Sequence, residues 1–316
     1  MKIGVSSCLL GNEVRYDGSG SKDQFVVNQL GQFFDFVPYC PESVIFGTPR
    51  DTIRLVDENN SIKVYTNKSK EDVTSILDQE SFNQANDVQN HDICGFILKS
   101  KSPTCGLERV KVYQTKRNLN EKKGVGLFAA QLLKMYPYLP IEEDGRLNDP
   151  WLKENFIMQV FAYGDLMNFI KNDPNHKKLV EFHTSYKYLI YAKSQSSYKE
   201  LGNIVANHDK KDFNTLLDEY KNGFLKGIAI KGTINKTYNV LLHIFGYFKK
   251  DITSGEKEVI LSSLEEYKNG IIPLIAVIKI LNIYVKRFDV EYLKTQKFLN
   301  PYPHELALRS DLKAYK

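Results

Sequence analysis

The sequence predicts an α/β domain followed by a mainly α-helical domain. Up to about residue 150, short apolar runs typical of buried strands alternate with helix-like segments. That alternation indicates an open, mostly parallel sheet with helices on both faces. Beyond residue 150, apolar residues recur at helical spacing nearly throughout. We therefore predict an N-terminal domain over residues 1–155 and a C-terminal domain over residues 156–316.

The elements of the N-terminal half follow from short-range signals. Apolar runs bounded by Gly, Pro or Ser predict strands at residues 2–6, 34–39, 95–99 and 110–113. Residues 24–34 and 70–89 have helical patterns. Residues 53–65 form an expected hairpin, with the turn-forming pair Asn59-Asn60 at its centre.

The helical half opens with a clear start signal. Asp149 is a suitable N-cap and Pro150 occupies the first helical position, so a long helix is expected from there to about residue 172. Later apolar stripes at helical spacing comprise Leu179, Phe182, Tyr186 and Ile190, and then Leu241, Ile244 and Phe248.

Composition and charge limit the class of protein. The chain has 316 residues, four cysteines and a formal net charge of +5. It contains no run of about 18 uncharged apolar residues, so we expect no membrane span. The N-terminus opens as a strand without an export signal, and the expected location is a reducing cytoplasm, where cysteines serve metals or catalysis more often than disulfides. The mild charge permits an anionic ligand without by itself indicating nucleic acid.

Three cysteines each lie just past a short apolar run, in a turn of small residues. Cys8 follows KIGVSS, Cys40 follows FFDFVPY and Cys105 follows FILKSKSPT. Because the carboxyl ends of parallel strands meet at one edge of an open α/β sheet, we expect these thiolates to converge there. Three protein ligands leave a metal centre one ligand short, and an open position is typical of a catalytic centre.

The cysteine pattern leaves alternatives. Thiolates select zinc, copper(I) or iron–sulfur clusters, and the sequence lacks the close Cys-X2–4-Cys pairs of a structural zinc site. Three buried, inert cysteines are a further alternative. The fourth cysteine, Cys94, precedes the strand that leads to Cys105. It lies at the wrong end of that strand to reach the same edge, and we interpret it as a small core residue.

The segment GVGLFA, residues 124–129, formally matches a dinucleotide-binding fingerprint. It follows a polar run over residues 118–123 instead of a predicted strand, so the structural context that the fingerprint needs is missing. We therefore assign no nucleotide to it.

Four blocks in the first 150 residues resemble the signature blocks of the thiouracil desulfidase family. They are SSCLLGNEVRYDG, CPE, TPR and KSKSPTCG, which begin at residues 6, 40, 48 and 99. The later segments GRLNDP, EFHTSYKYLIYA and NPYPHELALR resemble the YbgA-type domain that is often fused to that family. Several linked blocks in the right order are far more specific than any one of them.

The resemblance implies a [4Fe-4S] cluster held by Cys8, Cys40 and Cys105, with no protein ligand on the fourth iron. It also implies removal of sulfur from a 2-thiouracil-type base without net redox change. Glu42 and Ser102 match the functional Glu and Ser of the family, and are expected to assist proton transfer. The alternative to these catalytic roles is structural: Glu42 would cap the start of a helix, and Ser102 would stabilise a turn.

Two arginines near the cysteine turns, Arg15 and Arg50, can bind substrate or balance the charge of a cluster. We favour a scaffold role for them, with Asp17 as a partner.

Two further hypotheses stay open. The Lys-rich helical half suggests a redox-sensing or RNA-binding regulatory module that carries the cluster. Zinc in place of the cluster is the other. A small thiolated base is the partner expected for the desulfidase, and RNA is the alternative partner.

Overall fold

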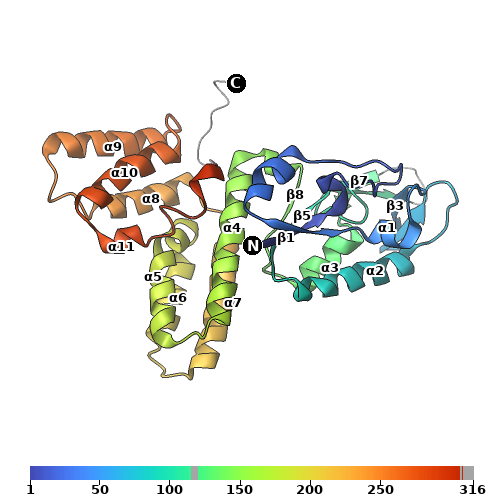
Figure 1. The fold of residues 1–316 in the computed structure, drawn as a ribbon, viewed down its shortest axis with the longest axis horizontal. Coiled ribbons are helices and arrows are strands. Elements are labelled where there is room, and N and C mark those ends of the chain that lie inside the picture. The colour runs from blue at the N-terminus through green and yellow to red at the C-terminus, as the bar shows by residue number, and fades with distance from the viewer. Residues whose placement is uncertain (115–119, 307, 309–316) are drawn as a thin grey trace. The chain divides into compact units, whose positions relative to one another are not determined.

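A computed structural model describes residues 1–114, 120–306 and 308 (Figure 1). Internal contacts divide the chain into a first unit, Met1–Phe156, and a second unit that begins at Ile157. The first unit is α/β and the second is helical, which confirms the predicted fold class. Whether these units are the two functional domains predicted at residues 1–155 and 156–316 stays a prediction.

Sheet A of the first unit is fully parallel. It contains β1 (Lys2–Ser6), β2 (Asp35–Tyr39), β5 (Ile93–Leu98) and β8 (Ile141–Glu143), in the order β2-β1-β5-β8. Every residue of β5 is buried, as expected of a central strand. The strands predicted at 2–6, 34–39 and 95–99 are confirmed within two residues at each end. Because the strands are parallel, the residues after Ser6, Tyr39, Leu98 and Glu143 share one edge.

Sheet B is mixed, so the first unit contains two sheets where the sequence suggested one. Its strands are β3 (Ile53–Glu58), β4 (Ser61–Thr66), β6 (Val110–Gln114) and β7 (Asn120–Gly124), in the order β4-β3-β6-β7. Only the β3–β6 pair is parallel. The predicted hairpin is confirmed, and Asn59 and Asn60 turn it with φ angles of 53° and 66°. Asn tolerates this left-handed conformation, which a tight hairpin needs.

Helices of the first unit cover these sheets. They are α1 (Pro41–Phe46), α2 (Thr74–Asp87) and α3 (Leu127–Met135). Leu77 of α2 belongs to the core of sheet B, and Phe128 of α3 packs against Phe96 of sheet A. The helix predicted at 70–89 is α2 followed by a 3-10 turn, Val88–Asn90. The segment predicted as a helix at 24–34 instead forms a π-helical turn, Phe25–Gln29, and a 3-10 turn, Leu30–Gln32.

The prediction that no strand leads into GVGLFA was wrong. Residues 120–124 form β7, which ends at the first glycine of this segment. However, β7 pairs antiparallel with β6 and is an edge strand of sheet B, so it is not part of a parallel βαβ unit. Its charged side chains are exposed, so the segment lacks the apolar residues by which strands are recognised in a sequence.

The second unit is built from helices. They are α4 (Pro150–Lys171), α5 (His176–Lys193), α6 (Gln195–Ala206), α7 (Phe213–Ala229), α8 (Ile234–Phe245), α9 (Ser254–Lys268), α10 (Leu274–Arg287) and α11 (Glu291–Lys294). Asp149 caps α4 as predicted, because its Oδ1 accepts a hydrogen bond from Leu152 N at 2.9 Å. Both predicted apolar stripes join the core of this unit. Over the described residues, no helix is long and apolar enough to cross a membrane.

Candidate functional site

A pocket of about 270 Å³ lies at the carboxyl edge of sheet A. Its wall is formed largely by the segments that follow β1, β2 and β5. The five residues predicted from the sequence all line it: Cys8, Cys40, Glu42, Ser102 and Cys105. Cys94 lies at the opposite end of β5, is 9% exposed and is absent from this wall. The structure therefore brings three of the four cysteines together.

Local structure explains the positions of the first two cysteines. Cys8 lies in the 3-10 turn Ser7–Leu10, which Gly11 closes with a φ of 95° and a hydrogen bond from its N to Cys8 O at 3.1 Å. A glycine suits that left-handed position. Cys40 is the N-cap residue of α1, and its Sγ lies 3.9 Å from Val14 O.

The loop of Cys105 is anchored from two directions. Ser102 Oγ accepts hydrogen bonds from Thr104 N and Cys105 N, both at 3.1 Å. The first amides of α3 also donate to this loop, with Gly126 N bonded to Gly106 O at 2.8 Å and Phe128 N bonded to Thr104 O at 2.9 Å. Ser102 therefore stabilises this turn, as its structural alternative predicted. Its hydroxyl proton is not used by these two bonds, so a catalytic role remains compatible with them.

We expect Ser102→Ala to loosen the Cys105 loop. The substitution leaves two part-buried amides without their acceptor, at a cost of about 1–3 kcal/mol. Anaerobic denaturant unfolding should show the loss, and Ser102→Thr, which keeps a hydroxyl, should restore most of it. Equal stability of all three proteins would contradict this role.

Gly126 lets the backbone of α3 approach the Cys105 loop closely. A Cβ at this position would lie 2.4 Å from Thr104 O and 2.9 Å from Cys105 N, both of which are backbone atoms. We expect Gly126→Ala to cost about 1–3 kcal/mol through overpacking and to lower the iron content of reconstituted protein. Gly202→Ala is the matched control, because a Cβ at Gly202 of α6 meets nothing within 4 Å. Equal iron content and stability in both variants would refute the expectation.

The thiols and Glu42 interact electrostatically. Burial raises the pKa of the Cys8 thiol to about 11, and Cys40 adds to this effect. Burial also raises the pKa of the Cys105 thiol well above its ordinary value, while Ser6 opposes the shift and Cys40 and Glu42 add to it. Thiols in such surroundings ionise when a bound metal centre supplies positive charge.

The residues present fit a [4Fe-4S] cluster. Within the described ranges, no three Cys, His, Asp or Glu side chains converge closely enough to hold a single metal ion. A cluster does not require such convergence, because each cysteine binds a different iron. Thr104, next to Cys105, is fully buried, and among the described residues its Oγ1 has no hydrogen-bond partner. Thr104 does not line the pocket, so the fit rests on the three thiolates, which are the usual donors to such a cluster.

Glu42 is held in place by Arg50. The Arg50 Nη2 lies 3.0 Å from Glu42 Oε2, and its Nε lies 3.3 Å from the same oxygen. Arg50 Nη1 donates to Val14 O and Gly47 O at 2.9 and 3.0 Å. Arg50 is thus part of the scaffold as predicted, but its partner is Glu42 instead of Asp17, since folding places α1 beside the turn that carries Arg50.

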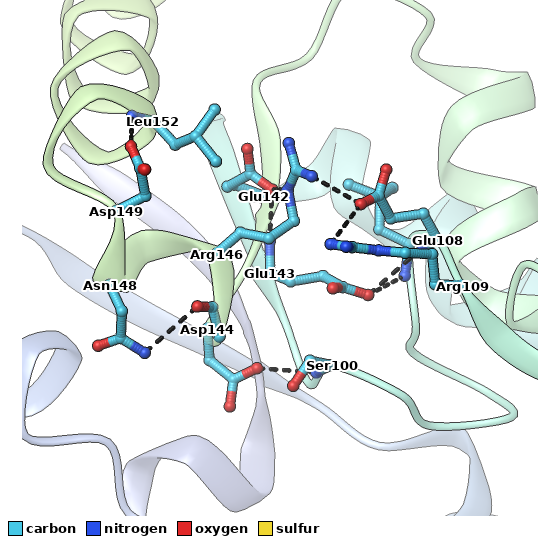
Figure 2. A network of polar contacts seen from close by, with 12 residues as sticks. Ser100, Glu108, Arg109, Glu142, Glu143, Asp144, Arg146, Asn148, Asp149 and Leu152 are labelled. Carbon is cyan, nitrogen blue, oxygen red and sulfur yellow. Dashed lines mark hydrogen bonds and ion pairs between the residues drawn. The ribbon is translucent and has the colours of Figure 1, made fainter. Parts of the chain in front are cut away.

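Sequence reasoning missed an acidic run beside the pocket, Glu142, Glu143 and Asp144, whose members are all buried. Glu143, shown in Figure 2, accepts a hydrogen bond through Oε1 from Leu107 N at 2.7 Å, just beyond the Cys105 turn. Asp144 binds Lys99, a residue that lines the pocket. The available signal was position, because Lys99 follows β5 and the acidic run lies at the end of β8, at the same edge as the cysteines.

A second, larger pocket of about 610 Å³ adjoins the first. The two share Ile53, Ser100, Lys101 and Pro103. Its remaining wall is rich in cations: Arg54, Arg109, Lys111, Lys122 and Arg146.

Two of these arginines are paired within the wall of the second pocket. Arg109 and Arg146 bind Glu108 at 2.7 and 2.6 Å (Figure 2). Arg54 lies over the Tyr113 ring at 5.3 Å, and its buried Nε has no hydrogen-bond partner in the part of the chain that the structure describes. The wall also contains the carboxylates Glu108 and Glu143, so its positive charge for an anionic group comes from Arg54, Lys111 and Lys122.

Comparisons with known proteins follow the same division of the chain. Residues 3–144 match the family described as 2-thiouracil desulfurase, and residues 187–303 match a family described as a protein of unknown function, DUF1722. The uncharacterised protein YbbK of Bacillus subtilis strain 168 is 32% identical over 152 residues, which are 46% of this chain and 97% of YbbK. The uncharacterised protein YbgA of Escherichia coli K12 is 24% identical over 157 residues, which are 49% of this chain and 93% of YbgA.

One solved structure also matches the chain. It is described as the [4Fe-4S]-dependent thiouracil desulfidase TudS, is 28% identical, and covers 46% of this chain and 93% of its own, with a TM-score of 0.36. The family match over residues 3–144 contains all three cysteine turns of the first pocket. The chain therefore belongs to the 2-thiouracil desulfurase family through its N-terminal region, which is followed by a DUF1722 region of the YbgA type.

Proposed function

We propose that the protein is a [4Fe-4S]-dependent desulfidase that replaces the sulfur of a thiolated pyrimidine with oxygen. The observation that carries the proposal is the pocket in which Cys8, Cys40 and Cys105 meet Glu42 and Ser102, inside the region that matches the family. Three thiolates would hold the cluster through three irons. The bound cluster would supply an open iron as a Lewis acid for the substrate sulfur.

The residues of the chain would manage the protons of the reaction. A thiocarbonyl and one water give a carbonyl and hydrogen sulfide, so atoms balance and no electrons are exchanged. Arg50 engages Glu42 through Oε2, which orients Oε1 as the oxygen that takes a proton from the attacking water. The Ser102 hydroxyl would donate a hydrogen bond to the ring of the substrate. Arg50, held by two carbonyls as well, keeps this carboxylate in place.

The second pocket favours a substrate that carries phosphate. Its cations adjoin the cysteine pocket directly, and Arg54, which lines it, supplies a guanidinium group for an anion. A thiolated nucleotide, or a thiolated base within RNA, would place its base in the first pocket and its phosphate in the second. A free base would use only the first pocket.

An anaerobic assay of sulfide release tests both parts of the proposal. The panel contains thiouracils, thiouridines, their 5′-monophosphates and thiolated tRNA. We expect release that depends on the cluster, with a higher kcat/KM for the phosphate-bearing forms. Arg54→Met should lower kcat/KM for those forms about tenfold and leave the free base unchanged, in keeping with one charged hydrogen bond.

Two results would count against the proposal. If no member of the panel released sulfide from cluster-loaded protein, the desulfidase assignment would be wrong. If the free bases reacted best and Arg54→Met had no effect, the phosphate role of the second pocket would be wrong while the desulfidase assignment stood. Metal analysis of freshly isolated protein separates the cluster from zinc.

A further inference from the structure

Lys99 presents an ammonium group to the pocket of the three cysteines. It follows β5 directly, and its backbone N donates to Ser6 Oγ at 2.9 Å, which fixes it beside the turn of Cys8. Its side chain lines the pocket and is 29% exposed. Lys99 therefore lies in the same pocket wall as Cys8, Cys40 and Cys105.

Asp144 holds this ammonium in one position. Lys99 Nζ lies 2.5 Å from Asp144 Oδ2. Asp144 Oδ1 accepts a hydrogen bond from Ser100 N at 2.8 Å, a contact drawn in Figure 2. The Asp144 side chain is only 8% exposed. Burial alone would raise the pKa of Asp144, but Lys99 and the Ser100 amide hold it below its ordinary value. A carboxylate that stays ionised fixes a side chain that is otherwise flexible.

The other cations of the pocket are placed differently, and one of them, Lys101, is exposed. Arg50 is committed to Glu42 and to two carbonyls. Arg15 lies over the Tyr16 ring at 5.6 Å and reaches Ser19 Oγ at 3.5 Å. Lys99 lines the pocket and uses one of its three N–H groups for Asp144.

We propose that Lys99 stabilises the negative charge on the departing sulfur, and that Asp144 positions Lys99 for this task. The inference rests on the proposed function. As the carbon–sulfur bond breaks, its electron pair moves to sulfur, and a fixed cation beside the pocket offsets that charge without reorganising. Lys99 transfers no proton in this scheme, so the balance of the reaction is unchanged. Asp144 is a positioning residue, since it acts through Lys99.

Lys99→Met removes the cation and tests the proposal. We expect kcat for sulfide release to fall about 10²- to 10³-fold, as for other preorganised donors, with little change in KM. Two further readouts do not depend on turnover. The midpoint potential of the cluster should become more negative, because reduction adds charge that Lys99 no longer offsets. Hydrosulfide added anaerobically to cluster-loaded protein should bind about tenfold more weakly.

Three variants sharpen the comparison. Lys99→Arg should restore much of the potential and of the hydrosulfide affinity, because it keeps the charge. Asp144→Asn should give a smaller fall in kcat than Lys99→Met, because Lys99 remains but loses its ionic anchor. Lys2→Met, at the opposite end of β1 and exposed, removes the same charge from the same sheet and should change none of these measurements.

The possible failures are distinguishable. Suppose that the wild type is active and that Lys99→Met has the same kcat, midpoint potential and hydrosulfide affinity. That result would overturn the role of Lys99 and leave the desulfidase proposal intact. A cluster-loaded wild type that released no sulfide would overturn the desulfidase proposal, and the hydrosulfide affinity would then decide the role of the cation by itself. If Lys99→Met failed to fold, Lys99→Arg and Asp144→Asn would decide by the same measurements.

Discussion

Cys105→Ala is expected to abolish sulfide release and to remove most of the bound iron. Cys105 lies in a loop that is anchored by hydrogen bonds to Ser102 and to the first turn of α3. The residue is buried and lines the pocket. Losing one of three thiolates leaves two irons of the cluster without a protein ligand. The measurements are iron and acid-labile sulfide per chain, and the visible absorbance of anaerobically reconstituted protein.

Cys94→Ala provides the matched control for this experiment. Cys94 is also a buried cysteine of the first unit, but it lies at the far end of β5. We expect this variant to keep iron, absorbance and activity at the level of the unmodified protein. Full cluster content in Cys105→Ala, or equal losses in both variants, would show that the pocket does not hold the cluster through Cys105.

Glu42→Gln is expected to lower kcat for sulfide release by about 10²- to 10⁴-fold while the cluster remains bound. The substitution keeps the shape of the side chain and can still accept from Arg50, but an amide cannot take a proton from water. The iron content should therefore match that of the unmodified protein, which separates this variant from the cysteine variants. Single-turnover sulfide release under anaerobic conditions measures the effect.

Glu13→Gln is the control for the change in charge. Glu13 is an exposed residue of the segment after Cys8 and does not line the pocket. The control should retain full activity. A Glu42→Gln protein that kept more than about a tenth of the activity would rule out Glu42 as the general base, because such a residue normally contributes at least a hundredfold. Its contact with Arg50 would then be only structural.

Local signals predicted much of the fold correctly. β1 occupies residues 2–6 as expected, and the Asn59-Asn60 turn joins β3 and β4. Asp149 caps α4. Each of these features depends on residues a few positions apart, so propensity, capping and turn chemistry suffice to specify it.

Long-range pairing was less predictable. The division into two sheets depends on which strands pair, and β7 is a strand whose charged residues carry no apolar pattern. It forms because β6 offers an edge for it, a tertiary effect that overrides the local preference of NEKKG. The irregular turns at residues 25–32 likewise depend on packing, since their sequence indicated an ordinary helix.

The sequence by itself determined the residue types of the site and their places in the chain. Three cysteines in small-residue turns after strands, together with the family resemblance at Glu42 and Ser102, predicted which residues line the pocket and placed Cys94 outside it. Only the tertiary structure decided how these residues are held. It showed Arg50 fixing Glu42, α3 supporting the Cys105 loop, and Asp144 anchoring Lys99. The physical reason is that strand order and a shared sheet edge bring these groups within hydrogen-bonding distance, and no local pattern encodes that contact.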